Sequence, residues 1–246
     1  MSKFFVTGGS RGIGEGIVSH LSSLGHDVVF TYSTNQELAN DVVKNCSQNS
    51  GKVFATQMHL ETRDSIKNAI KEAGNYFQSE IDCLVNNAAI AQEKPFLEIT
   101  EEDWRRMHDI NLMGPFICSQ ELIPIMIKNG GGKIVNISSI GGQWGGLNQA
   151  HYASSKSGLI NLTKTIAKIF SKDGIIANCI AIGLVSTDMS ADELSREDGK
   201  NKISSIPIGR IGKISEVSSL VEYLCSEKSS YINGQCINLN GGMYLS

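Results

Sequence analysis

Residues 3–14 read KFFVTGGSRGIG, a short apolar strand that leads through a glycine-rich turn into a helix. Glycines at this turn let the main chain bend sharply and approach a ligand closely, and the helix N-terminus offers free N–H groups and a favourable dipole to a pyrophosphate. A tight turn without a ligand is the alternative reading of so short a motif. We expect a dinucleotide to contact Gly8, Ser10, Arg11, Gly12, Ile13 and Gly14.

The alternation of apolar strands and amphipathic helices continues to the end of the chain. Strands are predicted at 3–7, 27–32, 52–59, 81–86, 132–138, 176–182 and 236–239. Helices are predicted at 13–24, 35–49, 63–77, 101–128, 151–171 and 215–226. Strands this apolar fit a parallel sheet that is buried on both faces. The sequence therefore predicts an α/β fold, a Rossmann-like doubly wound parallel sheet of about seven strands flanked by helices, in a single domain over residues 1–246.

The composition excludes several functional classes. A net charge of −3 and a pI near 6.0 give the whole chain no attraction to nucleic acid. The six cysteines and five histidines show no metal-ligand spacing, so we expect no metal and read the cysteines as free, buried thiols. The N-terminus enters the glycine loop at once, and no apolar stretch stands out as a membrane span. We expect a cytoplasmic protein.

Three polar residues in the middle of the chain suggest carbonyl chemistry. Tyr152 and Lys156 are four residues apart, which places a phenol and an ammonium one turn apart on one helix face. Ser139, thirteen residues before Tyr152, offers a hydroxyl to a carbonyl oxygen. A surface Tyr–Lys pair and a plain strand end are the alternatives for each motif alone. Ser138 is a second serine, but the spacing favours Ser139.

The end of the second strand bears on cofactor choice. An NAD enzyme usually places an acidic residue there to accept from the adenosine ribose, whereas this chain has Tyr32 and Ser33. Arg11, in the glycine loop, can pair with a 2′-phosphate. These residues predict NADP(H) as the cofactor. A solvated loop cation is the other reading of Arg11.

In this order and spacing the motifs resemble the short-chain dehydrogenase/reductase family over nearly the whole chain. The glycine loop, the sequence NNAA at 86–89, Asn111, Ser139 and the pair Tyr152–Lys156 match the family's motifs. Within the family the chain resembles 3-oxoacyl-[acyl-carrier-protein] reductases, through residues 206–212 and 231–244. Ala89, His59 and Ile182 depart from the family pattern, and all three lie on the cofactor side.

The resemblance implies a function for individual residues. Tyr152 is the expected proton donor, with a pKa lowered by Lys156 and by the oxidised nicotinamide, and Ser139 holds the substrate oxygen. The expected catalytic set is Asn111, Ser139, Tyr152 and Lys156. Further cofactor contacts are expected from Tyr32, Ser33, His59, Leu60, Asn87, Ala88, Tyr152, Lys156, Ile182, Gly183, Val185 and Thr187. Substrate contacts are expected from Ser139, Gln143, Trp144, Gln149 and Tyr152, although packing alone also explains Trp144.

Asn111 lies four residues before a proline. Pro115 has no N–H to donate to the Asn111 carbonyl, which is therefore free to hold a water that links Lys156 to solvent. A polar kink without a relay is the alternative. Thr100, ahead of three acidic residues, predicts the capped start of this helix.

The substrate and the assembly remain open at this stage. A 3-oxoacyl group on an acidic carrier protein is the first choice by resemblance, with Lys128, Lys133 and Lys172 as candidate docking cations, although Asp173 opposes them. Other ketones, of sugar, polyketide or secondary-metabolite origin, and a non-catalytic dinucleotide sensor are the alternatives. The family resemblance and the apolar faces of helices 101–128 and 151–171 predict a homotetramer.

Overall fold

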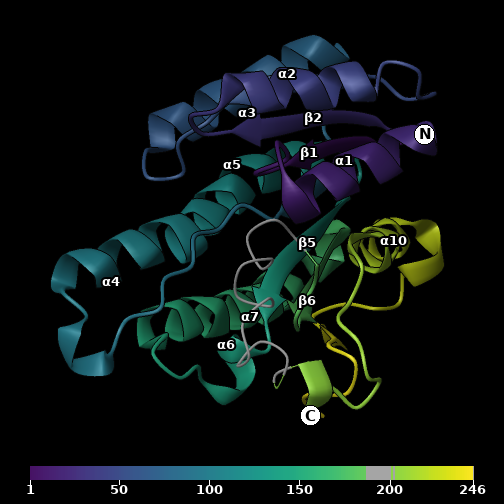
Figure 1. Ribbon diagram of the computed structural model, residues 1–246. Coiled ribbons are helices and arrows are strands. Elements are labelled where there is room, and N and C mark those ends of the chain that lie inside the picture. Colours follow the sequence, from purple (N-terminus) through teal and green to yellow (C-terminus); the bar gives the residue numbers. More distant parts are fainter. Residues whose placement is uncertain (187–200, 202, 246) are drawn as a thin grey trace.

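The computed structural model describes residues 1–186, 201 and 203–245, and its strands form one parallel sheet (Figure 1). The strand order is β3-β2-β1-β4-β5-β6-β7. The strands are β1 Lys3–Val6, β2 Asp27–Tyr32, β3 Val53–Gln57, β4 Cys83–Asn86, β5 Gly132–Ser139, β6 Ile175–Ile182 and β7 Cys236–Leu239. The predicted doubly wound α/β fold is confirmed, and each strand lies within two residues of its predicted bounds.

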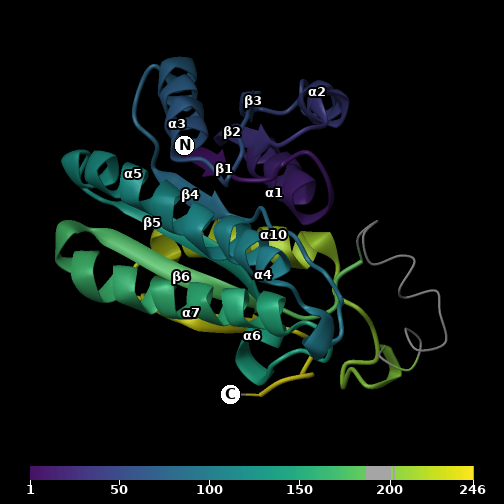
Figure 2. The same cartoon turned by 90° about the vertical axis from the view of Figure 1, so that its left-hand side faces the viewer.

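Helices cover both faces of this sheet (Figure 2). They are α1 Gly12–Ser23, α2 Gln36–Asn45, α3 Arg63–Phe77, α4 Glu101–His108, α5 Gly114–Lys128, α6 Gly141–Trp144, α7 Ala150–Phe170 and α10 Ile214–Cys225. Short 3₁₀ turns follow at η1 Phe96–Glu98, η3 Ser171–Asp173 and η4 Glu227–Ser229. The predicted helix 35–49 ends early, at Asn45, and α6 was not predicted.

Alternation along the strands divides the core into two apolar layers. Phe4 packs with α1, α2 and α10, whereas its neighbour Phe5 packs with α3, α5 and α7, because successive strand residues point to opposite faces. Both side chains are fully buried. The sheet is therefore a rigid central layer, and the loops at its carboxyl edge are held from two sides.

The predicted helix 101–128 contains a widened turn. A π-helical segment, η2 Asp109–Met113, separates α4 from α5, immediately before Pro115. Proline cannot donate to the carbonyl four residues earlier, and such a local defect is relieved by a π turn. Thr100 caps α4 as predicted, in a reciprocal capping box with Asp103.

The same segment bears on the membrane prediction. Residues Glu101–Lys128 are long and apolar enough to cross a membrane, with a mean hydropathy of 1.4, so the expectation that no stretch would pass this test is wrong. However, 56% of the 18-residue window is buried inside the protein. Since α5 packs on α3, β4 and β5, the apolar residues are those of a core helix.

Leu122 on α5 tests whether this core layer supplies the stability. Its side chain is fully buried, so Leu122→Ala is expected to lower the free energy of unfolding by about 2–5 kcal/mol. The matched control is Leu147→Ala, because Leu147 is 94% exposed and the same truncation there should change stability by less than about 0.5 kcal/mol. Urea denaturation of both variants measures the difference. Equal losses would contradict the burial argument.

Candidate active site

Ser139 is the last residue of β5, at the carboxyl edge of the sheet. Its Oγ accepts the N–H of Gly141 at 3.1 Å, which leaves the hydroxyl hydrogen free to be donated. Ser139 Oγ and the Tyr152 ring both lie against Gly141, at 3.4 Å and 3.9 Å from a Cβ placed there, and Ser139 lowers the pKa of Tyr152. The two oxygens that the sequence predicted to act on one carbonyl are therefore brought together.

Tyr152 and Lys156 lie one turn apart on α7. The Lys156 ammonium is 5.8 Å from the centroid of the Tyr152 ring and donates to the main-chain oxygen of Ile137 at 2.8 Å. Lys156 is only 3% exposed. Its ammonium is thus fixed under the phenol by a carbonyl of β5, the strand that carries Ser139, and the predicted triad of Ser139, Tyr152 and Lys156 is spatially complete.

The short helix α6 lies directly over these residues. A Cβ placed on Gly142 would come within 2.7 Å of the Lys156 main chain, so only glycine permits this approach. Sequence reasoning missed α6, because a four-residue helix rich in glycine gives no periodic signal. The run Gly141–Gly142 was the available sign that two segments pass closely here.

Burial governs the charge states of the pair. Desolvation lowers the pKa of the Lys156 ammonium to about 8. Burial raises the pKa of Tyr152 above its ordinary value, and the bond to Ser139 opposes this only in part. In the protein alone the pKa of Tyr152 is therefore raised, because burial is its largest cause. The lowering expected from Lys156 together with the oxidised nicotinamide stays a prediction. A phenol that stays protonated at neutral pH is suited to donate a proton.

Asn111 is fully buried in the π turn. Its amide clamps Ile90 on both sides, since Oδ1 accepts from the Ile90 N–H and Nδ2 donates to the Ile90 carbonyl, each at 2.9 Å. Nδ2 also reaches Ser155 Oγ on α7 at 3.3 Å. The side chain of Asn111 thus ties the segment after β4 to the catalytic helix. The water relay through its carbonyl stays a prediction.

The glycine loop has the shape that a phosphate site requires. Gly8 and Gly12 have φ values of 69° and 57°, and a Cβ on Gly14 would lie 2.0 Å from the Gly8 carbonyl. Among the described residues no side chain caps the first turn of α1, so its N–H groups face outward beside Ser10, Arg11 and Ile13. The residues present therefore fit a dinucleotide pyrophosphate.

Asn87 holds this loop rather than projecting from it. Its Nδ2 donates to the carbonyls of Thr7 and Gly8, both at 3.0 Å, and the Thr7 hydroxyl accepts from the N–H groups of Asn87 and Ala88 at 3.0 Å. A Cβ on Gly8 would meet Ala88 at 2.8 Å. The predicted contacts Asn87 and Ala88 thus lie against the loop. Thr7 was missed as a functional residue, although its place at the end of β1 was visible.

The adenosine side of the predicted site is formed by the ends of β2 and β3. Ser33 Oγ lies 3.3 Å from His59 Nδ1, and both residues are exposed, as is Arg11. Tyr32 is half-buried against the core. Leu60 is buried in the core, so only its main chain is available to a ligand. Ser33, His59 and Arg11 are therefore the predicted contacts whose polar side chains are exposed to an adenosine ribose or its phosphate.

The predicted cofactor contacts at the end of β6 and just after it pack against neighbouring segments of the chain. The Ile182 carbonyl accepts from Ile140 at 3.0 Å, and Gly183 packs so closely on Asn240 that a Cβ would approach to 2.9 Å. Val185 is buried and pairs with Gly212 in a single β-bridge. Thr187 lies outside the described residues.

The predicted substrate residues flank the helix α6. Trp144 is 50% exposed and meets Tyr244 edge to face, with ring centroids 6.0 Å apart. Gln149 precedes α7, where its carbonyl accepts from Ala153 at 2.8 Å. Gln143 instead points inward, and its Nε2 lies 3.7 Å from Cys236 Sγ. Trp144 is thus exposed beside Tyr244, whereas Gln143 is an anchor of α6.

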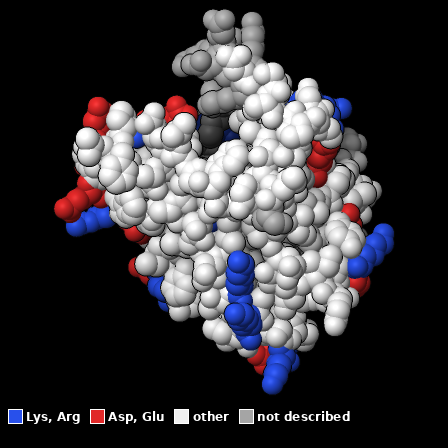
Figure 3. Space-filling model, turned by 90° about the horizontal axis from the view of Figure 1, so that it is seen from below, with Lys and Arg blue, Asp and Glu red and all other residues white. Residues whose placement is uncertain are grey.

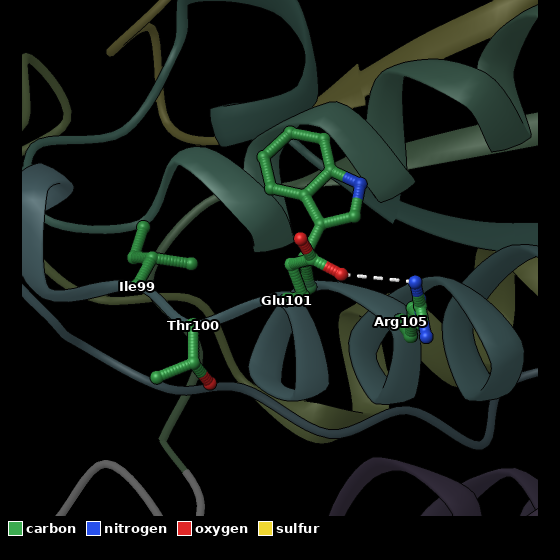
Figure 4. A pocket seen from close by; sticks show the side chains of 5 residues that line it. Ile99, Thr100, Glu101 and Arg105 are labelled. Carbon is green, nitrogen blue, oxygen red and sulfur yellow. Dashed lines mark hydrogen bonds and ion pairs between the residues drawn. The ribbon is translucent and has the colours of Figure 1, made fainter.

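A separate hollow of about 400 Å³ lies at the start of α4 (Figure 4). Glu101 and Arg105, one turn apart on α4, line it and form an ion pair of 2.9 Å. None of the predicted site residues lines it. Within the described part of the chain, no three metal-ligating side chains come together.

Comparisons with known proteins agree with this geometry. A family model described as enoyl-(acyl carrier protein) reductase matches residues 8–244. The chain is 38% identical over 240 residues to the 3-oxoacyl-[acyl-carrier-protein] reductase FabG of Staphylococcus aureus, covering 98% of this chain and 97% of that protein. It is 40% identical to the FabG of Aquifex aeolicus, over 97% of this chain and 96% of the relative. A short-chain type dehydrogenase/reductase structure from Mycobacterium ulcerans superposes with a TM-score of 0.94 at 25% identity, covering 98% of this chain and 89% of that one.

The buried ammonium predicts how stability depends on pH. The folded pKa of Lys156 is about 8, against an ordinary value of 10.5, so between these values the unfolded chain binds the extra proton. Stability must then rise with pH across that window. Compared with Lys156→Met, which has no charge to bury, the wild type should gain stability between about pH 8 and about pH 10.5. Urea unfolding of both proteins measures this, and a constant difference would contradict it.

Proposed function

This chain belongs to the short-chain dehydrogenase/reductase family, and from that membership we propose that it reduces a 3-oxoacyl thioester to the secondary alcohol with NADPH. The family and its relatives make it an oxidoreductase acting on CH–OH and C=O groups. The observation that carries the proposal is the cluster of Ser139, Tyr152 and Lys156 at the same carboxyl edge of the sheet as the glycine loop.

The chemistry requires a hydride for carbon and a proton for oxygen. Bound NADPH supplies the hydride. Ser139 donates to the carbonyl oxygen, since its own acceptor position is already filled by Gly141. Tyr152 transfers its phenolic proton to the same oxygen, and the Lys156 ammonium stabilises the phenolate that remains. Ile137 holds that ammonium in place.

The preference for NADPH rests on the surface around the end of β2. Arg11 is exposed at the glycine loop, and Ser33 is exposed at the end of β2. A 2′-phosphate there gains a guanidinium and a hydroxyl and meets no carboxylate at Tyr32. Membership in the short-chain dehydrogenase/reductase family implies a nicotinamide dinucleotide as the cofactor.

The substrate proposal comes from the relatives, whose names describe an acyl group carried on a protein. Lys128 and Lys172 are candidate docking cations for an acidic carrier, whereas Lys133 is already paired with Glu227 at 3.8 Å. Asp173 directly follows Lys172 and opposes an acidic partner. A free ketone of sugar, polyketide or other secondary-metabolite origin is therefore the second candidate.

We also propose a cytoplasmic homotetramer. The face that carries α6, α7 and the C-terminus shows few charged side chains (Figure 3). Apolar side chains on α4, α5 and α7 remain exposed, among them Trp104 at 41% and Ile169 at 60%. Association would cover such residues. The six cysteines are free, and five are buried, which suits a reducing compartment.

Tyr152→Phe separates an enzyme from a sensor. Removing the proton donor should lower kcat/KM for a 3-oxoacyl thioester by about 10²- to 10⁴-fold, while NADPH affinity changes little. The matched control is Tyr231→Phe, which deletes a phenol hydroxyl from a fully exposed ring and should leave turnover intact. NADPH oxidation is followed with 3-oxoacyl and enoyl thioesters, carrier-bound and free, and with sugar and polyketide ketones.

The same assay decides between the alternatives. NADPH binding without turnover on any substrate would favour a sensor, and reduction of the enoyl substrate alone would assign the other reaction named by the family model. Equal kcat/KM on carrier-bound and free thioesters would show that no carrier is recognised. A fully active Tyr152→Phe enzyme would contradict the mechanism.

Arg11→Ala tests the cofactor proposal. Loss of a charge-assisted phosphate contact of about 1.5–3 kcal/mol should weaken NADPH binding by about ten- to a hundredfold, with NADH almost unaffected. Arg105→Ala, which removes an exposed arginine on α4, is the control and should alter neither affinity. Fluorescence titration measures both dinucleotides. If Arg11→Ala weakened both equally, the 2′-phosphate would have to be recognised elsewhere.

A further inference from the structure

Two thiols lie side by side beneath the candidate active site. Cys179 on β6 and Cys236 on β7 are register partners in the parallel sheet, so their side chains point to the same face. Each thiol shifts the pKa of the other, upward for Cys179 and downward for Cys236. Ser138, which lowers the pKa of Cys179, donates to the Lys156 carbonyl at 2.9 Å. The pair is therefore in contact with the catalytic surroundings.

The backbone spacing permits a covalent link between these two residues. Neighbouring strands are about 4.8 Å apart, which lies inside the Cα separation of about 4.4–6.8 Å found in disulfides. In the described part of the chain β7 pairs only with β6, and it is four residues long. An edge strand of this length can make the small adjustment that brings two sulfurs into bonding distance.

The two sulfurs differ in how easily an oxidant reaches them. Cys179 is fully buried, whereas Cys236 is half-exposed at the edge of the sheet. The neighbouring Cys179 thiol lowers the pKa of Cys236, and the charge of Lys164 acts in the same direction. Thiolate is the form that attacks an oxidant. Cys236 is thus suited to react first and Cys179 to resolve the product.

We propose that Cys179 and Cys236 form a peroxide-sensitive modification site that closes to a disulfide. In the first step the Cys236 thiolate attacks one oxygen of hydrogen peroxide, the O–O bond breaks, and sulfenic acid and hydroxide form. In the second step the Cys179 sulfur attacks the sulfenic sulfur, and the hydroxyl leaves as water with the thiol proton. Two electrons pass from the two sulfurs to the peroxide, and thiol reductants reverse the change.

The disulfide acts on the site through Gln143. In the reduced protein Gln143 Nε2 reaches Cys236 Sγ at 3.7 Å, and this is the contact that ties α6 to β7. Drawing the sulfur toward Cys179 breaks that contact and releases α6, which lies over Lys156 and carries Trp144. Oxidation should therefore slow turnover while the glycine loop, on the far side of β4, keeps its affinity for NADPH.

A second thiol pair provides an internal control. Cys83 on β4 and Cys225 at the end of α10 are also neighbours, and Cys225 raises the pKa of Cys83. Both are buried, and β4 is held between β1 and β5. This pair has neither the access nor the freedom to move that Cys236 has, so it should stay reduced.

The experiment treats the full-length protein with hydrogen peroxide, blocks remaining thiols with N-ethylmaleimide and maps the peptides by mass spectrometry. We expect one linked pair, Cys179–Cys236, that dithiothreitol separates. Turnover of the oxidised protein should fall roughly two- to tenfold and recover on reduction, the change expected from loss of one hydrogen bond. Cys236→Ser should abolish both the link and the loss of turnover, whereas Cys225→Ser should keep both.

Two outcomes would overturn the proposal. One is oxidation of Cys236 to a single-sulfur acid with no link to Cys179 at any peroxide dose. The other is linkage of Cys83 to Cys225 at the same dose, which would show that access does not select the pair. Because the peptide map needs no substrate, it stands even if the proposed reductase activity fails.

Discussion

The pairing of β1 with β4 is the constraint on which the site depends. At this pair the strand order reverses, and the connections on its two sides run in opposite directions across the sheet. The loops after β1 and β4 therefore separate and leave a crevice at the carboxyl edge. Asn87 and Thr7 hold the glycine loop at that crevice by hydrogen bonds of 3.0 Å. The cofactor side of the site is thus set by side-chain to main-chain hydrogen bonds between the ends of two strands.

The chemical side depends on one buried charge. Lys156 is held by the Ile137 carbonyl, and both belong to elements that also position Ser139 and Tyr152. Burying the Lys156 ammonium lowers the stability of the protein, as the lowered pKa of this group shows. The fold nevertheless keeps the ammonium beneath the Tyr152 phenol. Such a cost is typical of functional sites, where local stability is given up for a defined charge.

Much of this arrangement was predictable from local patterns. Apolar runs located all seven strands, and the spacing of Tyr152 and Lys156 placed them on one helix face. Pro115 marked the place of the widened turn in helix 101–128, because proline has no N–H to donate to the carbonyl four residues earlier. Signals that depend on one residue type or on a short period are readable without a structure.

Features that depend on strand neighbours were not predictable. Cys179 and Cys236 are 57 residues apart in the sequence, and only the order of β6 and β7 makes them partners. The burial that raises the pKa of Tyr152 in the protein alone was not predicted either, because it depends on α6 and the segment around it. The hydrogen bonds from the Asn87 amide to the Thr7 and Gly8 carbonyls were not predicted, because they join the ends of two strands that lie far apart in the sequence.

Transfer of a labelled hydride tests the central claim most directly. The protein is incubated with NADPH deuterated at the reactive carbon of the nicotinamide and a 3-oxoacyl thioester, and the product is examined by mass spectrometry and NMR. A ketone reductase must place deuterium on the carbinol carbon and take the hydroxyl proton from solvent through Tyr152. We predict a singly deuterated 3-hydroxyacyl product. Product without deuterium at that carbon would contradict the account.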